Sequence, residues 1–233
     1  AAVVMHSLTK YIGGHGAVIG GVIIDGANFD WTADPKRQPL FNEPDPSYGG
    51  VVWGEAVPQI TGHNIPFAIR ARVCLLRDLG SCLSPDNAFQ VIQGIETLPL
   101  RMRQNCSNAE KVVDFLEDHP KVERVIYPKN YDGVVGERAE RYFNGGFGAL
   151  VGLELKGGIE AGKKFINSLK LFYHVANIGD ARSLAIHPAT TTHSQLTPEE
   201  QLASGVTPGY VRLSLGIEHP DDLLSDLKQA LEA

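Results

Sequence analysis

Near the start of the chain, Lys10 has neighbours that suit covalent chemistry with an aldehyde. It lies in the segment HSLTKYIGGHG, with Ser7 and Thr9 before it and a glycine-rich run, residues 13–16, after it. At pH 7 an unperturbed lysine is neutral in only about one molecule in 2,500, which makes it a poor nucleophile or base. Forming an imine with an aldehyde cofactor removes that difficulty, so we take Lys10 as the candidate catalytic residue.

The residues around Lys10 suit one class of aldehyde, a phosphorylated pyridine. Ser7 and Thr9 are two apart at the end of an expected strand, so both hydroxyls should lie on one side of the backbone and can hold a phosphate. The glycines of residues 13–16 let the backbone pass close to a flat ring. The pattern SxTK alone also fits a surface lysine that follows a strand, and the longer segment is needed to decide.

Apolar runs along the chain predict the elements that position these residues. The expected strands are residues 3–6, 17–25, 122–128, 148–155, 171–176 and 210–217, and the expected helices are residues 84–118, 160–168, 198–204 and 220–232. Because strands and helices alternate, we predict an α/β fold, an open sheet covered by helices.

A proline in the longest expected helix marks a domain boundary. Pro99 interrupts the long helical pattern, and a proline inside a helix removes a backbone hydrogen bond and kinks or breaks it. We therefore predict two domains, residues 1–98 and residues 99–233.

Residues 29–53 form an expected long loop. They are rich in proline, aspartate and aromatic residues without a helical or strand period, and so long a loop in a compact domain is usually functional or packed on a partner.

Composition excludes several classes of function. The chain has 233 residues, 43% of them hydrophobic, and a formal net charge of -6, which argues against nucleic-acid binding. The longest apolar run, residues 16–24, is much shorter than the roughly 20 residues that span a bilayer, and no secretory signal is visible. The three cysteines form no CxxC pair and the histidines lack metal-ligand spacing, so we expect a cytoplasmic protein without a metal site.

Longer stretches resemble the Cys/Met metabolism family, the transsulfuration enzymes that use pyridoxal 5'-phosphate (PLP). The resemblance covers essentially the whole chain. It rests on HSLTKYIGGHG followed by IGGVIIDGANFDW, then on LSPDNAFQVIQGIETLPLRMRQNCSNAEKVVDFLEDHPKVERVIYP and NIGDARSLAIHPATTTHSQLTPEEQLASGVTPGYVRLSLGIEHPDDLLSDL. It is nearest to the O-acetylhomoserine sulfhydrylase branch, because the other branches typically lack an insertion as long as residues 29–53.

The resemblance implies roles for five residues. Lys10 matches the lysine that binds the cofactor aldehyde, and Ser7 and Thr9 match hydroxyls that hold its phosphate. Arg212, in YVRLSLGIE, matches the arginine that receives the substrate α-carboxylate, for which a planar guanidinium can form two parallel hydrogen bonds. Ser183, in DARSLAIHP, matches a position that helps to hold the same carboxylate.

The resemblance also implies a fold and a reaction. The fold is the PLP-dependent transferase fold, aspartate aminotransferase-like and of fold type I, in which residues 1–98 are the C-terminal portion of the PLP-binding domain and residues 99–233 a C-terminal α/β domain. The reaction is a γ-replacement that converts O-acetylhomoserine and sulfide, or a thiol, to homocysteine and acetate in methionine biosynthesis. The alternatives are a cystathionine or methionine γ-lyase, a cystathionine γ-synthase, or a non-catalytic fragment that acts as a structural subunit.

One part of the family pattern cannot be identified in this chain. Family members carry, upstream of the lysine, an aromatic residue that stacks on the pyridine ring and an aspartate that pairs with its nitrogen. We therefore expect this chain to pair with a missing N-terminal half, to be inactive alone, and to work within a homotetramer built from dimers. The strands near Val3 and Ile19 should then belong to a mostly parallel sheet and leave an exposed edge and an uncovered apolar face.

Overall fold

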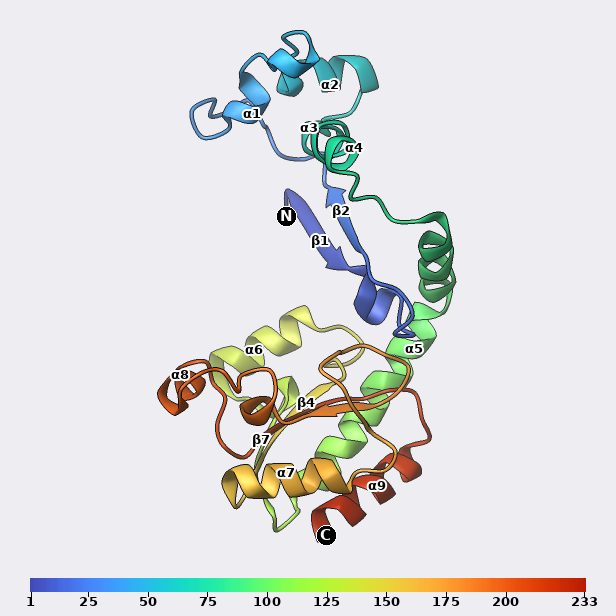
Figure 1. The fold of residues 1–233 in the computed structure, drawn as a ribbon, viewed down its shortest axis with the longest axis vertical. Coiled ribbons are helices and arrows are strands. Elements are labelled where there is room, and N and C mark those ends of the chain that lie inside the picture. Colours follow the sequence, from blue (N-terminus) through green and yellow to red (C-terminus); the bar gives the residue numbers. More distant parts are fainter. The chain divides into compact units, whose positions relative to one another are not determined.

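A computed structural model describes residues 1–233 and divides the chain into two compact units. The N-terminal unit comprises Ala1–Leu8 and Ile19–Phe89, and the C-terminal unit comprises Thr9–Val18 and Gln90–Ala233 (Figure 1). The lysine segment, residues 6–16 around Lys10, therefore contributes to both units. No helix has the length and apolar character needed to cross a membrane.

The N-terminal unit contains one pair of strands. β1 (Val3–Ser7) and β2 (Gly21–Asp25) pair antiparallel, with β2 starting four residues later than the sequence predicts. Apolar side chains on this pair remain exposed, Met5 at 72% and Ile23 at 49%. The uncovered apolar surface is thus confirmed, and the larger, mostly parallel sheet around it stays a prediction.

Residues 29–53 are mostly turns and irregular chain, as their lack of periodicity predicts, and they are packed rather than open. Together with the helix that follows, they pack into an aromatic lobe around buried Phe41 and Trp53, with the rings of Trp31 and Phe41 4.6 Å apart. The Asn64 side chain donates a hydrogen bond to the Phe29 carbonyl, at the start of this lobe, at 2.7 Å. The helical elements here are α1 (Pro39–Asn42), η2 (Pro46–Tyr48), α2 (Trp53–Thr61), α3 (Pro66–Arg70), η3 (Ala71–Leu76) and α4 (Arg77–Leu79).

The longest helix, α5 (Pro85–Glu117), continues through Pro99, so the predicted interruption at this residue is wrong. An interior proline costs a helix about 3 kcal/mol. Burial offsets that cost, because the second half of α5 places Val112 and Leu116 in the core at 1% and 0% exposure. The compact units divide between Phe89 and Gln90, and the domain boundary at residues 98/99 stays a prediction.

The C-terminal unit is built on a five-stranded sheet in the order β3-β4-β7-β6-β5. All neighbours are antiparallel except β5 and β6, which are parallel. The strands are β3 (Val122–Ile126), β4 (Leu150–Leu155), β5 (Tyr173–His174), β6 (Leu184–Ile186) and β7 (Tyr210–Ser214). The sequence predicts each of them except β6, whose three residues are too few to show a period.

Alternation along β4 and β7 places one set of side chains in the core and Arg212 on the opposite face of the sheet. Val151, Leu153, Val211 and Leu213 are fully buried, in a core that also includes side chains of α5, α7 (Gly158–Ser168) and α9 (Pro220–Glu232). Arg212 lies between two of these positions and so points to the opposite face. The remaining helices are α6 (Gly133–Tyr142) and α8 (Pro198–Ala203) (Figure 1).

A buried carboxylate ties α9 to the chain after α7. Asp226 is 6% exposed and accepts hydrogen bonds from the backbone amides of Lys170, Leu171 and Phe172, at 2.9, 2.8 and 3.2 Å. We expect Asp226→Ala to lower the free energy of unfolding by about 2–4 kcal/mol, because three donors lose a charged acceptor. Urea unfolding measures this. Glu232→Ala, on the exposed surface of the same helix, is the control, and equal stability of the two variants would contradict the assignment.

Candidate active site

The backbone that carries Lys10 is not the loop or strand end that the sequence suggests. β1 ends at Ser7, and Leu8–Ile12 form a π-helical turn that is broken at Lys10, where φ is -90° and ψ is -136°. Thr9 lies in this turn, so the strand alternation that was expected to align the two hydroxyls ends before it. The phosphate-binding roles of Ser7 and Thr9 stay predictions, and Ser7 lies in the N-terminal unit.

Asn177 joins the two predicted cationic residues in the C-terminal unit. The Lys10 amine donates a hydrogen bond to the Asn177 side-chain oxygen. One terminal nitrogen of Arg212 donates to the Asn177 main-chain carbonyl at 3.2 Å. The structure thus brings Lys10 and Arg212 to a single residue, which lies in the connection between β5 and β6. Sequence reasoning missed Asn177, although it opens the family-like segment NIGDARS.

Arg212 has donors available for a ligand. The only hydrogen bond of its side chain is the one to Asn177, and the side chain forms no ion pair. It also lines a cavity of about 340 Å³, together with Tyr127, Tyr131 and Tyr210. Burial raises the pKa of Tyr210, which keeps its hydroxyl uncharged at neutral pH. A guanidinium with free N–H groups beside an aromatic wall can bind a carboxylate through two parallel hydrogen bonds.

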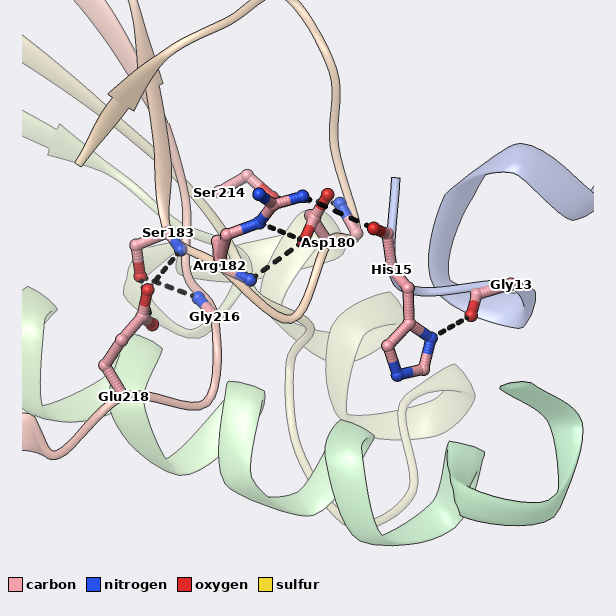
Figure 2. Close-up of polar contacts among 9 residues, drawn as sticks. Gly13, His15, Asp180, Arg182, Ser183, Ser214, Gly216 and Glu218 are labelled. Carbon is pink, nitrogen blue, oxygen red and sulfur yellow. Dashed lines mark hydrogen bonds and ion pairs between the residues drawn. The ribbon is translucent and has the colours of Figure 1, made fainter. Parts of the chain in front are cut away.

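The lysine segment is fastened to the connection that carries Asn177. The Ala181 amide donates to the Gly14 carbonyl at 2.8 Å, and Arg182 donates to the His15 carbonyl at 3.3 Å. Asp180 holds Arg182 in place by accepting from its backbone and side-chain nitrogens at 3.0 and 3.3 Å (Figure 2). These hydrogen bonds hold the backbone after Lys10 against the backbone after Asn177.

Ser183 is fully buried, and its donors are already used. Its backbone amide and its hydroxyl donate to the two carboxylate oxygens of Glu218, at 2.6 and 2.8 Å, and its hydroxyl accepts from the Gly216 amide (Figure 2). This network ties the start of β6 to the end of β7. The predicted role of Ser183 in holding a substrate carboxylate stays a prediction, and it would require these bonds to be exchanged.

The chain is similar to known proteins along its whole length. The family model described as Cys/Met metabolism PLP-dependent enzyme matches residues 1–232. An O-acetyl-L-homoserine sulfhydrylase of Leptospira meyeri is 54% identical over 100% of this chain and 53% of its own length. O-acetyl-L-homoserine sulfhydrylase 1 of Thermus thermophilus is 49% identical over 99% of this chain and 53% of its own length. The chain therefore spans about half the length of the curated relatives it matches.

A solved structure confirms the predicted fold, an α/β PLP-dependent transferase fold without its N-terminal half. The crystal structure of a putative O-acetylhomoserine (thiol)-lyase from Campylobacter jejuni superposes with a TM-score of 0.90 at 39% identity. The match covers 100% of this chain and 54% of that one, which is described as containing a pyridoxyl-lysine phosphate.

The donor set around Lys10 fits PLP. Its amine is held by a neutral amide and forms no ion pair, so no carboxylate competes to keep it charged. The hydroxyl residues Ser7 and Thr9 precede it in the sequence, and Arg212 donates a hydrogen bond to the same asparagine. A lysine, hydroxyls for a phosphate and an arginine for a carboxylate are the groups that a PLP site for an amino acid needs.

The neutral character of Asn177 can be tested. In Asn177→Asp a carboxylate would pair with the ammonium form of Lys10 and oppose the proton loss needed for attachment to an aldehyde. We expect the full-length protein, meaning this chain with the N-terminal half that its relatives have, to take up PLP at least about tenfold more slowly, a difference of about 1.4 kcal/mol. Borohydride fixation and mass spectrometry of the Lys10 peptide measure this. Asn144→Asp, at an exposed position, is the control, and uptake at its rate would contradict the role.

Proposed function

Because the chain belongs to the Cys/Met metabolism family of PLP-dependent enzymes, we propose that it is the C-terminal part of an O-acetylhomoserine sulfhydrylase. The proposed reaction is a γ-replacement that converts O-acetylhomoserine and sulfide to homocysteine and acetate. The proposal rests on the hydrogen bonds that Lys10 and Arg212 both donate to Asn177, because one amino acid substrate needs both groups close together. The names of the relatives at 54% and 49% identity favour this branch over the lyases.

Lys10 has two tasks in this proposal. PLP, when bound, supplies an electron sink for the negative charge that develops at the substrate Cα. Lys10 holds the cofactor between turnovers, and Ser7 and Thr9 hold its phosphate. Once the substrate amine has replaced it, the free Lys10 amine can take a proton from Cα and one from Cβ as acetate leaves from Cγ. It can return protons to Cβ and Cα after sulfide has added at Cγ. Asn177 supports both tasks because its side-chain oxygen orients the amine without adding charge.

Arg212 orients the substrate. Two parallel hydrogen bonds to the α-carboxylate fix the rotation of the substrate as well as its position, so that the Cα proton faces Lys10. Only one of the Arg212 donors is used, on the Asn177 carbonyl. Apolar and aromatic side chains line the neighbouring cavity, and an ion pair is stronger where such side chains replace water.

The proposal includes partners. An N-terminal half would supply the groups for the pyridine ring and cover the exposed apolar side chains of β1 and β2, such as Met5 and Ile23. Met5, 72% exposed, is the observation that supports this covering. A homotetramer built from dimers, a cytoplasmic location and inactivity of this chain by itself belong to the same proposal.

The reaction is tested with the full-length protein loaded with PLP. O-acetylhomoserine is supplied with and without sulfide, and homocysteine and 2-oxobutyrate are quantified. We expect homocysteine to dominate when sulfide is saturating, and Lys10→Ala to retain less than a few per cent of the activity. Mainly 2-oxobutyrate would indicate a γ-lyase, efficient use of cysteine a cystathionine γ-synthase, and no turnover by the loaded protein a structural subunit.

Arg212→Lys tests the binding of the carboxylate. A lysine keeps the charge but loses the paired geometry, so the substrate can rotate away from Lys10. We expect kcat/KM to fall by more than about fivefold, which corresponds to roughly 1 kcal/mol. Arg124→Lys, at an exposed position on β3, is the matched control. If the two variants have equal steady-state kinetics, Arg212 does not hold the carboxylate.

A further inference from the structure

A buried arginine without an acidic partner lies in α5. Arg101 is only 5% exposed and takes part in no ion pair. Burial lowers its pKa, which reflects the cost of removing a charge from water. A cation in such a position is expensive unless most of its N–H groups find acceptors. The acceptors that satisfy Arg101 therefore indicate what the residue does.

The acceptors of Arg101 include the two residues that directly follow Lys10. One terminal nitrogen donates to the Tyr11 carbonyl at 2.8 Å, and the other donates to the Ile12 carbonyl at 3.3 Å. The second nitrogen also reaches the Gly94 carbonyl at 2.6 Å. The third nitrogen, Nε, donates to the Thr97 hydroxyl at 3.1 Å, which orients the plane of the guanidinium.

Two glycines make room for these contacts. A Cβ atom on Gly94 would lie 2.6 Å from the Ile12 carbonyl oxygen and 2.4 Å from that of Gly13, so only glycine allows α5 to approach this closely. A Cβ atom on Gly14, whose φ is +69°, would lie 1.9 Å from a terminal nitrogen of Arg101. The space for the guanidinium is thus defined from both sides, by the helix and by the lysine segment.

We propose that Arg101 is a positioning residue that aims Lys10 by holding the Tyr11 and Ile12 carbonyls. This inference rests on the proposed function. These carbonyls belong to the second and third peptide groups after Lys10, so holding them fixes the turn Leu8–Ile12 from which the Lys10 side chain leaves the backbone. Asn177 then receives the amine. A displacement of about 1 Å at a proton-transferring group can cost on the order of a hundredfold in rate. Arg101 touches no reacting atom and acts only through the backbone.

A guanidinium is required for this role. A lysine at position 101 would bring the charge but not the planar set of donors that reaches two successive carbonyls and the Thr97 hydroxyl. Full-length Arg101→Ala, loaded with PLP, should show a kcat at least about thirtyfold lower. Its KM for O-acetylhomoserine should stay within about threefold, because Arg212 is untouched. Arg101→Lys should lose nearly as much, and Arg103→Ala, an exposed arginine of the same helix, should behave as the wild type.

Chemical rescue separates positioning from general stability. Millimolar methylguanidinium should raise the kcat of Arg101→Ala at least about fivefold and speed the capture of added PLP by Lys10, followed by absorbance. Methylammonium, which brings charge without the planar donors, should have no such effect. Neither compound should change Lys10→Ala or Arg103→Ala.

Three results would overturn the inference. The first is a kcat and a PLP capture rate in Arg101→Ala equal to those of Arg103→Ala. The second is a loss of kcat that only matches the loss of folded, PLP-loaded protein. If Arg101→Ala does not fold, Thr97→Val is used instead, because it removes the acceptor that orients Nε of Arg101. The third result is a PLP capture rate in Thr97→Val that equals the wild-type rate. PLP capture does not depend on the amino acid substrate, so it tests Arg101 even if no homocysteine forms.

Discussion

The site depends on one neutral residue that lies between two cations. Asn177 accepts a hydrogen bond from Lys10 through its side chain and one from Arg212 through its main chain. A carboxylate on this side chain would form an ion pair with Lys10 and oppose loss of the Lys10 proton. An amide gives direction without charge, so both residues remain available for ligands.

The rest of the C-terminal unit holds this arrangement in place, and α5 links its parts. Arg101 of α5 binds the backbone that follows Lys10, and Asn108, seven residues later, donates to the Gly216 and Glu218 carbonyls at 3.0 and 2.9 Å. Gly216 lies just beyond β7, the strand that carries Arg212. The part of α5 that follows Pro99 therefore holds the backbone near both cationic residues.

Sequence patterns predicted the parts of the fold that depend on local burial. Apolar patterns predicted β4, β7, α7 and α9. The motif around Lys10 led to the candidate catalytic residue, and the family resemblance of YVRLSLGIE led to Arg212. They did not predict that α5 continues through Pro99, because the compensation comes from packing of residues far along the helix. Asn177 was missed for a similar reason, since a polar residue in a connection acquires its role only from the two residues that the fold brings to it.

The aromatic lobe of residues 29–53 has a consequence for how such enzymes diversify. The lobe packs around Phe41 and Trp53 and against Phe67 of α3, and the bond from Asn64 to the Phe29 carbonyl joins the start of the lobe to the chain after α2. Residues 29–64 therefore begin and end at nearly the same point. A change of length inside such a segment need not shift the register of β2. Length variation at this point of the chain is therefore structurally inexpensive, and an engineer could graft a lobe of different composition there.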